Sequence, residues 1–418
     1  MKATLCAAVL LAFPTIGHDD PKASQRMPLT VHEWGTFTFV QGSDGTTLEG
    51  LRHDDWDLPS FVARRTRAAR SENRTKMETP VTYFYTPREQ DVRVSVEFPS
   101  GLFTHWYPDV RAFAPKLADE SGEAPKLEGG VLEWGTVHLT PPAQFQDQLP
   151  DVEGKSHYRH ARDVDAAFVR LCGAFGMQHE RFLFYRGLGG LASPVTSRYL
   201  AITESDGALS AQLELTAPLP SGPMSATPVE LPHVYVLAVK EGRGRFVYLP
   251  ALRAGRTLTP TISVGKDAPP LDDMVAEVQR HMVSSLQALG LYEKEAWAMV
   301  RTWAESYFRN EGVRVLFAIP QAVTDVVLPL KVDPKPDKTV RVMIARVECV
   351  TPAQEKSVHE QIQLLASPDA AVSKRAGETL LAMGRIAEPL LKRSIACCGD
   401  AQRPDLVRAL LQSFHPER

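Results

Sequence analysis

Residues 31–39 read VHEWGTFTF, a run of aromatic and β-branched residues that predicts a β-strand. Part of this run recurs 100 residues later, where residues 131–136 read VLEWGT. The chain has only six tryptophans, so four consecutive identities are too many for chance. The repeat indicates either a duplicated unit or two strands in equivalent places of one sandwich. The flanking residues do not align, which favours the second interpretation.

Strand patterns continue on both sides of this repeat. Residues 92–98 read VRVSVEF and alternate valine with polar residues, while residues 234–239 and 245–249 flank the hairpin signal Glu241-Gly242-Arg243-Gly244. The 32 prolines exclude a chain dominated by long, uninterrupted helices. We therefore expect a β-rich body over residues 28–265, built as one sandwich or as two, at 28–150 and 180–265.

Helical patterns begin after this body. Residues 272–289 and 294–308 place apolar side chains at helical spacing, and strand-like runs follow at 313–319 and 340–347. Together they predict a mixed helix and strand subdomain at 270–350.

The last part of the chain, residues 351–418, differs again. Its only aromatic residue is Phe414, and alanine, leucine and glycine recur at helix-turn-helix spacing. The segment resembles HEAT-type repeats over about one and a half repeats, too few for a free-standing solenoid, so it should pack on the body. The predicted fold class is therefore α+β, with an antiparallel β-sandwich-rich body, a helical subdomain and a C-terminal HEAT-like helical segment.

The amino terminus has the pattern of a signal peptide. Lys2 is followed by an apolar run of about 11 residues, Pro14 ends that run, and Thr15 to Gly17 offer small residues for cleavage. We expect residues 1–17 to be a signal peptide and the mature chain to be periplasmic or secreted. No later segment approaches 18 apolar residues, so no transmembrane helix is expected in the mature chain.

Charge and cysteine content limit the classes of partner and cofactor. The net charge of -3, from 47 basic and 50 acidic residues, argues against a polycation for nucleic acid, and none is expected. Four cysteines follow the signal peptide, and the sequence leaves their disulfide pairing open: Cys172, Cys349, Cys397 and Cys398. Cys172 has no nucleophile signature and is expected to be a buried thiol. No cofactor is identified, and CxxC motifs are absent.

Several segments resemble those of one protein family. Residues 32–38 read HEWGTFT, residues 182–187 read FLFYRG, and residues 77–85, 290–303 and 312–316 fit as well. Over about residues 30–350 the chain resembles a family of uncharacterised exported bacterial proteins. The resemblance implies export and a shared fold, but it transfers no activity and no catalytic residue.

Acid–base chemistry is possible without a recognised motif. Ionisable residues lie in or beside apolar and aromatic segments, where burial raises the pKa of a carboxyl group: Glu33, Glu78, His105, Asp165 and Glu348. A glycosidase needs two carboxyl groups roughly 5–9 Å apart. Equally, each residue could cap backbone amides or pair with Arg186 or Arg346. For Glu33 and Trp34 a structural role is favoured, because the repeat keeps both residues and replaces His32 by Leu132.

Candidate binding and metal residues have common structural explanations too. Trp106 and Tyr107 suit stacking on a sugar, although aromatic core packing is the more frequent role. Arg186 precedes a glycine-rich turn that could present amides to an anion. His157 and His160 would share a helix face as a weak metal pair. The run His53-Asp54-Asp55 could hold a hard cation, but it lacks regular loop spacing.

The leading functional hypothesis is an envelope-associated binding or scaffolding protein whose partner is an envelope polymer or a protein. It follows from the absence of a catalytic motif, the sandwich pattern and the repeat-like tail. The alternative is a hydrolase acting on carbohydrate or another envelope polymer through paired carboxylates. That alternative requires a concave pocket holding at least two of the five acid–base candidates. The sequence does not reveal the oligomeric state.

Overall fold

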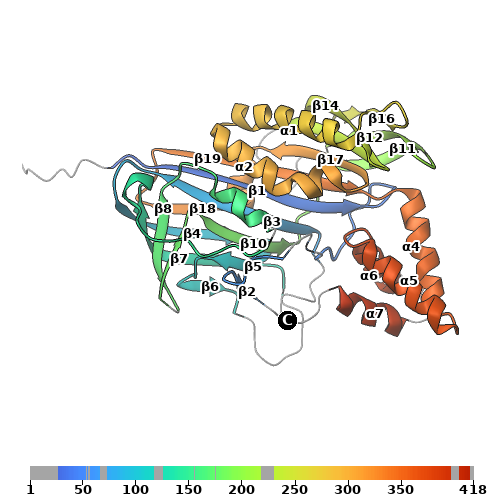
Figure 1. The fold of residues 1–418 in the computed structure, drawn as a ribbon, viewed down its shortest axis with the longest axis horizontal. Coiled ribbons are helices and arrows are strands. Elements are labelled where there is room, and N and C mark those ends of the chain that lie inside the picture. Colours follow the sequence, from blue (N-terminus) through green and yellow to red (C-terminus); the bar gives the residue numbers. More distant parts are fainter. Residues whose placement is uncertain are drawn as a thin grey trace, which may run out of the picture.

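The computed structural model describes residues 27–52, 54, 57–65, 73–116, 126–154, 156–174, 176–217, 230–396 and 404–414. The predicted signal peptide, Cys397 and Cys398 lie outside these residues. The described part is an α+β protein with three sheets and helices concentrated toward the C-terminus, so the predicted fold class is confirmed (Figure 1).

A nine-stranded sheet forms the centre of the molecule. In order, its strands are β14 (Arg243–Arg253), β13 (Glu230–Lys240), β17 (Gly312–Ile319), β19 (Lys338–Cys349), β1 (Thr30–Gln41), β3 (Thr75–Tyr85), β10 (Leu183–Gly189), β5 (Gly101–Tyr107) and β2 (Ala63–Arg64). Only the β1–β19 pair is parallel, with Thr30 opposite Lys338 and Gln41 opposite Cys349. The sheet takes strands from both predicted sandwich sections and from the 270–350 segment.

Two smaller sheets pack on one face of this large sheet. One contains β18 (Leu330–Asp333), β4 (Gln90–Phe98), β7 (Gly130–Thr140), β8 (Phe168–Gly173), β9 (Gly176–Glu180) and β6 (Ala112–Ala114); the other contains β11 (Thr196–Ser205), β12 (Ala208–Thr216), β15 (Thr257–Leu258) and β16 (Thr261–Val264). Phe37 and Phe103 of the large sheet share a hydrophobic core with Phe98 and Leu132 of the first and Leu213 of the second. This sheet-on-sheet packing is the predicted sandwich arrangement.

Helices cover the opposite face of the large sheet. These are α1 (Leu271–Ala288) and α2 (Glu293–Ala304), extended by the π-helical turn η4 (Glu305–Arg309). Trp34, Tyr83 and Leu316 of the sheet pack there with Met282 and Trp303 of the helices. Among the described residues outside the tail, the remaining helical elements are η2 (Pro142–Gln144), η3 (His157–Arg162) and α3 (Gln321–Val327). No described helix is long and apolar enough to cross a membrane.

The C-terminal segment forms α4 (Pro352–Leu365), α5 (Ala370–Ala382), α6 (Ala387–Ala396) and α7 (Pro404–Ser413), called the tail below (Figure 1). Its apolar side chains pack against Val40, Leu48 and Leu51 of the body. Glu355 of α4 also accepts hydrogen bonds from the backbone N and the hydroxyl of Ser43, at 3.0 and 2.7 Å. The tail therefore packs on the body, as its small number of repeat-like units predicted.

The repeated Glu-Trp-Gly-Thr segment lies at a β-bulge in both of its copies. The β1–β3 register shifts between Trp34 and Thr36, and the β4–β7 register shifts at Trp134. A Cβ on Gly35 would lie 2.9 Å from the Cα of Pro80, so this close approach requires glycine. The two strands do not occupy equivalent places, however, because Trp34 packs beneath the helices and Trp134 packs inside the sandwich. That expectation was wrong: the shared sequence accompanies a shared bulge, not a shared environment.

Candidate functional site

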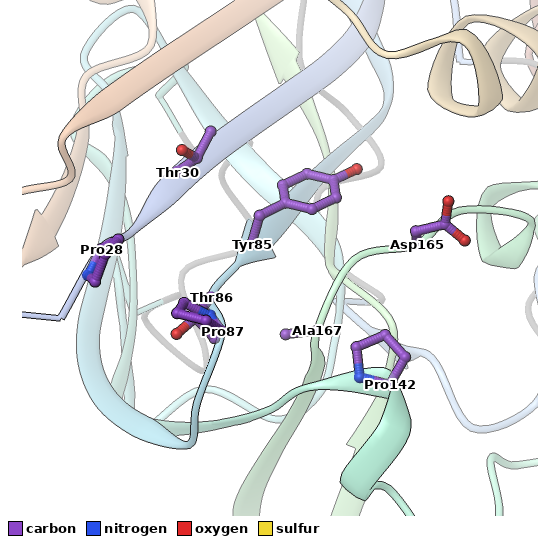
Figure 2. A pocket seen from close by; sticks show the side chains of 8 residues that line it. All are labelled: Pro28, Thr30, Tyr85, Thr86, Pro87, Pro142, Asp165 and Ala167. Atoms are coloured by element: carbon purple, nitrogen blue, oxygen red, sulfur yellow. The ribbon is translucent and has the colours of Figure 1, made fainter.

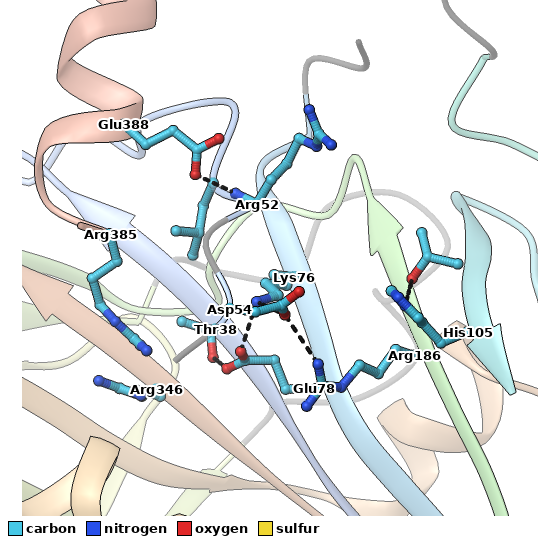
Figure 3. Close-up of polar contacts among 12 residues, drawn as sticks. Thr38, Arg52, Asp54, Lys76, Glu78, His105, Arg186, Arg346, Arg385 and Glu388 are labelled. Atoms are coloured by element: carbon cyan, nitrogen blue, oxygen red, sulfur yellow. Dashed lines mark hydrogen bonds and ion pairs between the residues drawn. The ribbon is translucent and has the colours of Figure 1, made fainter. Parts of the chain in front are cut away.

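A band of ionisable side chains crosses the helix-facing side of the large sheet, close to the tail. Neighbouring strands place Arg314 opposite Glu348, Arg346 opposite Thr38, Thr38 opposite Lys76, and Arg186 opposite His105. Together with residues from the adjacent loop and the tail they form the buried charge cluster, defined here as Thr38, Asp54, Lys76, Glu78, His105, Arg186, Arg314, Arg346, Glu348 and Arg385. Figure 3 labels all of these except Arg314 and Glu348, and Asp54 and His105 are the partly exposed members.

Asp54 and Glu78 share Lys76 at the centre of this cluster. The Nζ of Lys76 lies 2.7 Å from Asp54 Oδ1 and 3.0 Å from Glu78 Oε1. Arg186 donates to Asp54 at 3.0 Å, and Thr38 donates to Glu78 at 2.6 Å (Figure 3). Lys76, Glu78 and Arg186 are at most 4% exposed, so these charges are held in a water-poor interior.

Glu348 connects the sheet to the tail through three guanidinium groups. It contacts Arg314 Nε at 3.3 Å, forms an ion pair with Arg346, and lies 3.7 Å from Arg385 Nη1 of the tail. Arg314 and Arg346 are fully buried, and Arg385 is 6% exposed. Nearby, Glu388 of α6 accepts a hydrogen bond from the backbone N of Arg52 at 2.8 Å, as Figure 3 shows. The tail is thus attached by charges as well as by apolar packing.

Burial and charge act in opposite directions on the pKa values of this cluster. Burial would raise the pKa of Asp54, but the attraction of Lys76 and Arg186 outweighs it and lowers that pKa. The pKa of Glu78 is lowered in the same way by Lys76 and Arg346. Burial lowers the pKa of His105 to about 3. Both carboxylates are therefore ionised and His105 is neutral at pH 7.

Of the 53–55 run weighed as a cation site, the structure describes Asp54. Its carboxylate pairs with two protein cations, Lys76 and Arg186. His53 and Asp55 lie outside the described residues. No local pattern marked this role, because the two cations lie 22 and 132 positions away in the sequence.

Glu33 lies apart from this cluster, on the sandwich-facing side of β1. It is fully buried and accepts from Arg341 Nε at 2.8 Å, from Thr82 Oγ1 at 3.0 Å and from Tyr185 Oη at 2.5 Å. Burial and the charge of Glu33 raise the pKa of Tyr185 well above its usual value, so its hydroxyl remains a donor. These bonds give Glu33 the structural role that the repeat favoured.

An open pocket of about 270 Å³ lies at the other end of β1 and β3 (Figure 2). Its lining is Pro28, Thr30, Tyr85, Thr86, Pro87, Pro142, Asp165 and Ala167. Asp165 is the single acid–base candidate in it, and its Oδ1 lies 2.6 Å from Lys294 Nζ in an exposed ion pair. Of the five candidates, Glu78, His105 and Glu348 thus share the buried charge cluster, whereas Glu33 and Asp165 lie elsewhere.

Behind this pocket lies a polar network that the sequence did not indicate. The carboxylate of Glu295 accepts from Tyr85 Oη at 2.7 Å and from the backbone N of Tyr292 at 2.7 Å, and it lies 2.8 Å from His32 Nδ1. His32 and Glu295 are fully buried. Glu295 occupies the third position of α2, but the helix begins after Tyr292 and not after a Ser or Thr, so no capping-box pattern in the sequence identifies it.

The predicted sugar-stacking residues are part of the core. Trp106 is 7% exposed and packs on Phe113, with ring centroids 5.0 Å apart. Tyr107 is 3% exposed and packs on Phe61 at 4.6 Å. Arg186 is also buried and bonded to Asp54. In this conformation none of the three side chains presents a surface to a ligand in solvent. Their roles are the structural ones that the sequence also allowed: core packing for the aromatic residues and an ion pair for Arg186.

The structure also describes the two histidines proposed as a metal pair and two of the four cysteines. His157 and His160 lie in η3, with ring centroids 6.1 Å apart. Within the described ranges no group of three or more His, Cys, Asp or Glu side chains could hold a metal ion. Cys172 is exposed on β8, so the expectation of a buried thiol was wrong there, whereas Cys349 is buried and its pKa is raised to about 12 by burial and Glu348. Both are free thiols.

We expect the replacement His105→Gln to flatten the pH dependence of stability between pH 7 and 5. The folded pKa of about 3 lies below the unfolded value of about 6.5, so the unfolded chain binds more protons in this interval and stability falls as the pH falls. Over this range wild type should lose about 1–2 kcal/mol more unfolding free energy than the variant. Urea unfolding at pH 7, 6 and 5 measures this.

The control for this experiment is His359→Gln, an exposed position on α4. The comparison stays above the pH at which Asp54 and Glu78 protonate in the unfolded chain, near 4. The charged groups that act on His105 are Asp54, Arg186, Arg64 and Lys76, and Asp54 stays ionised over this range because its pKa is lowered. Parallel profiles for wild type and His105→Gln would show that His105 is accessible to protons in the folded state.

Comparisons with known proteins give little similarity. No protein-family model matches the chain, and no curated protein matches it. Among solved structures, the yeast delta-COP-I mu-homology domain complexed with a Dsl1 WxWxV peptide is similar over 77% of this chain and 96% of that chain, with a TM-score of 0.28 and 9% identity. A second structure of that yeast domain gives a TM-score of 0.26 and 10% identity over the same shares. At these values the likeness carries no conclusion about fold or function.

Proposed function

We propose that the mature chain is an exported binding or scaffolding protein of the cell envelope. The observation that carries this proposal is the distribution of its acid–base candidates. Glu33, Glu78 and Glu348 are held by buried ion pairs, and the open pocket contains Asp165 as its single carboxylate. Glycoside hydrolysis through paired carboxylates needs two such groups around one solvent-accessible space, so the hydrolase alternative has less support.

Export is supported by the predicted signal peptide at residues 1–17, and the partner is an envelope protein or polymer. A fusion of residues 1–30 to a reporter enzyme that is active only outside the cytoplasm tests the first part. We expect reporter activity from the fusion and its loss when Leu5 and Leu10 are both replaced by arginine, because charge interrupts the apolar run. Equal activity from both fusions would contradict export by this segment.

Binding and hydrolysis are distinguished by incubating the purified chain with insoluble cell-wall polymer and, separately, with extracted envelope proteins. The proposal expects a saturable complex with one of the two fractions and no increase of soluble polymer fragments over several hours. Fragments that accumulate with time and with protein concentration would overturn it. In that case Asp165→Asn, compared with Asp267→Asn on an exposed loop, would test whether the pocket releases them.

A further inference from the structure

Strand β14 forms an end of the large sheet and is paired along one side only. Ten of its 11 residues pair with β13, Pro250 being the exception, and the described residues supply no strand on its outer side. Contacts on that side occur at its start, where Arg243 forms an isolated bridge with Pro270 and Gly244 N donates to Pro269 O at 3.3 Å. The rest of this edge, from Arg245 to Arg253, is called the β14 edge below.

The turn before β14 determines which backbone groups face outward. The loop Glu241-Gly242 has two residues, both with positive φ, which is the tight hairpin geometry in which the flanking residues Lys240 and Arg243 exchange hydrogen bonds. Odd-numbered residues of β14 therefore bond to β13, and even-numbered residues point outward. Gly244, whose N–H donates to Pro269, follows this rule. The N–H groups of Phe246, Tyr248 and Leu252 face outward in the same way.

Apolar side chains flank these outward groups on both faces of the sheet. Toward α1, the rings of Phe246 and Tyr248 lie 6.0 and 4.4 Å from the ring of His281. Toward the sandwich, Val247 and Leu249 pack on the core, and all four strand residues remain partly exposed. An added strand would thus gain backbone hydrogen bonds and cover apolar surface on both of its faces.

The charges along this segment indicate the chemistry of the partner. Residues 243–256 contain no acidic residue and four arginines, two on each side of the apolar middle: Arg243, Arg245, Arg253 and Arg256. Arg245 pairs with Asp267 at 3.2 Å, and Arg253 pairs with Glu230 at 2.6 Å. The side chains of these two arginines and of their two carboxylate partners are each 42% exposed or more. Such exposed pairs contribute little to stability, so carboxylates of a partner can replace them.

The same charges disfavour a second copy of the chain as the occupant. Antiparallel pairing of two β14 edges would place Arg243 and Arg245 of one copy near Arg253 of the other. Like charges opposite each other in a sheet are destabilising. An extended segment with carboxylates at both ends and apolar residues between them meets no such repulsion.

We propose that the β14 edge binds an extended acidic peptide segment of a protein partner, which adds to the large sheet as a further strand. This inference rests on the proposed binding function and specifies its partner as a protein. The partner strand accepts from the N–H groups of Phe246 and Tyr248 and places its carboxylates beside Arg245 and Arg253. Pro250 has no N–H, so the hydrogen bonds concentrate in the first half of the edge.

A labelled peptide with two glutamates at each end of Val-Thr-Val-Thr-Val tests this on the full chain by fluorescence anisotropy. A matched peptide with lysines in place of the glutamates serves as the control probe. We expect saturable binding of the acidic peptide, at least tenfold weaker binding of the lysine peptide, and at least tenfold weakening by the double replacement Arg245→Glu and Arg253→Glu. The control variant is Arg198→Glu on β11, where the arginine is 50% exposed and pairs with Glu214 of β12; it should leave the affinity for the acidic peptide unchanged.

Hydrogen exchange distinguishes strand addition from general electrostatic attraction. The bound peptide should slow exchange at Phe246 and Tyr248 and leave Met177 and Gln178 of the β9 edge unchanged. No binding, binding without this protection, equal affinity for the lysine peptide, or dimers that form through β14 would each overturn the inference. If the complex with the envelope fraction forms and the double variant does not weaken it, the proposed binding function is retained and the β14 edge is rejected as the binding site.

Discussion

Replacing Glu33 by alanine lowers the free energy of unfolding by about 3–5 kcal/mol, because it leaves the buried Arg341 without its main counter-charge. The guanidinium is at most 2% exposed and lies 2.6 Å from Glu33 Oε2. The second carboxylate that pairs with Arg341 is Asp325, which is half exposed and contacts Nη1 of the guanidinium. The hydroxyls of Tyr185 and Thr82 also lose their acceptor. Urea unfolding followed by tryptophan fluorescence and by circular dichroism measures the effect.

Two variants control for the substitution itself. Glu133→Ala removes the equivalent glutamate of the repeat, which is exposed, and should change stability by about 0.5 kcal/mol or less. The pair Glu33→Leu with Arg341→Met removes both charges together and should recover most of the loss, since apolar residues of similar size can replace a buried ion pair. If Glu33→Ala costs no more than Glu133→Ala, the ion pair does not stabilise the fold.

The faces of β1 were predictable from the sequence. Alternation along a strand places Val31 and Glu33 on one side and His32 and Trp34 on the other. The structure confirms this, because Val31 lies in the sandwich core and Trp34 beneath the helices. Alternation also predicts that the two members of a His-Glu pair on one strand cannot share a site, and Glu33 and His32 indeed have separate partners.

The pairing of strands was not predictable, and the candidate site depends on it. β1 lies between β19 and β3, so residues about 308 positions apart become neighbours in the sheet. Arg346 and Thr38 meet for this reason, and nothing in either local sequence indicates it. Local patterns identify which side chains share a face of one strand, whereas the buried charge cluster requires the order of six strands and the position of the tail. The five acid–base candidates could therefore be named but not placed together.

The buried charge cluster attaches the tail to the large sheet through an ion pair, in addition to the apolar packing between tail and body. Arg385 is the tail residue that approaches Glu348, at 3.7 Å, and burial lowers its pKa to about 9. A helical tail that only packed its leucines on Val40 and Leu48 would not need an arginine here. Because Glu348 also contacts Arg314 and Arg346, the loss of one carboxylate should affect the sheet and the tail together.

We therefore expect Glu348→Gln to lower the free energy of unfolding by about 3–5 kcal/mol and to make the tail more sensitive to protease. The replacement keeps the shape of the side chain and removes the charge that three buried guanidinium groups share. Urea unfolding gives the energy, and limited proteolysis followed by mass spectrometry shows whether cleavage moves to residues 351–396. The matched control is Glu214→Gln, which breaks the exposed Arg198 pair and should cost about 1 kcal/mol or less.

A second variant separates charge from packing at the tail junction. Arg385→Met removes one guanidinium and keeps an unbranched apolar chain, so Glu348→Gln should cost less in the Arg385→Met background than in wild type, by about 1 kcal/mol or more. The difference between the two backgrounds is the coupling energy between sheet and tail. Equal costs in both backgrounds would mean that Arg385 does not interact with Glu348, and that the tail is held by its apolar contacts and by hydrogen bonds such as those of Glu355 and Glu388.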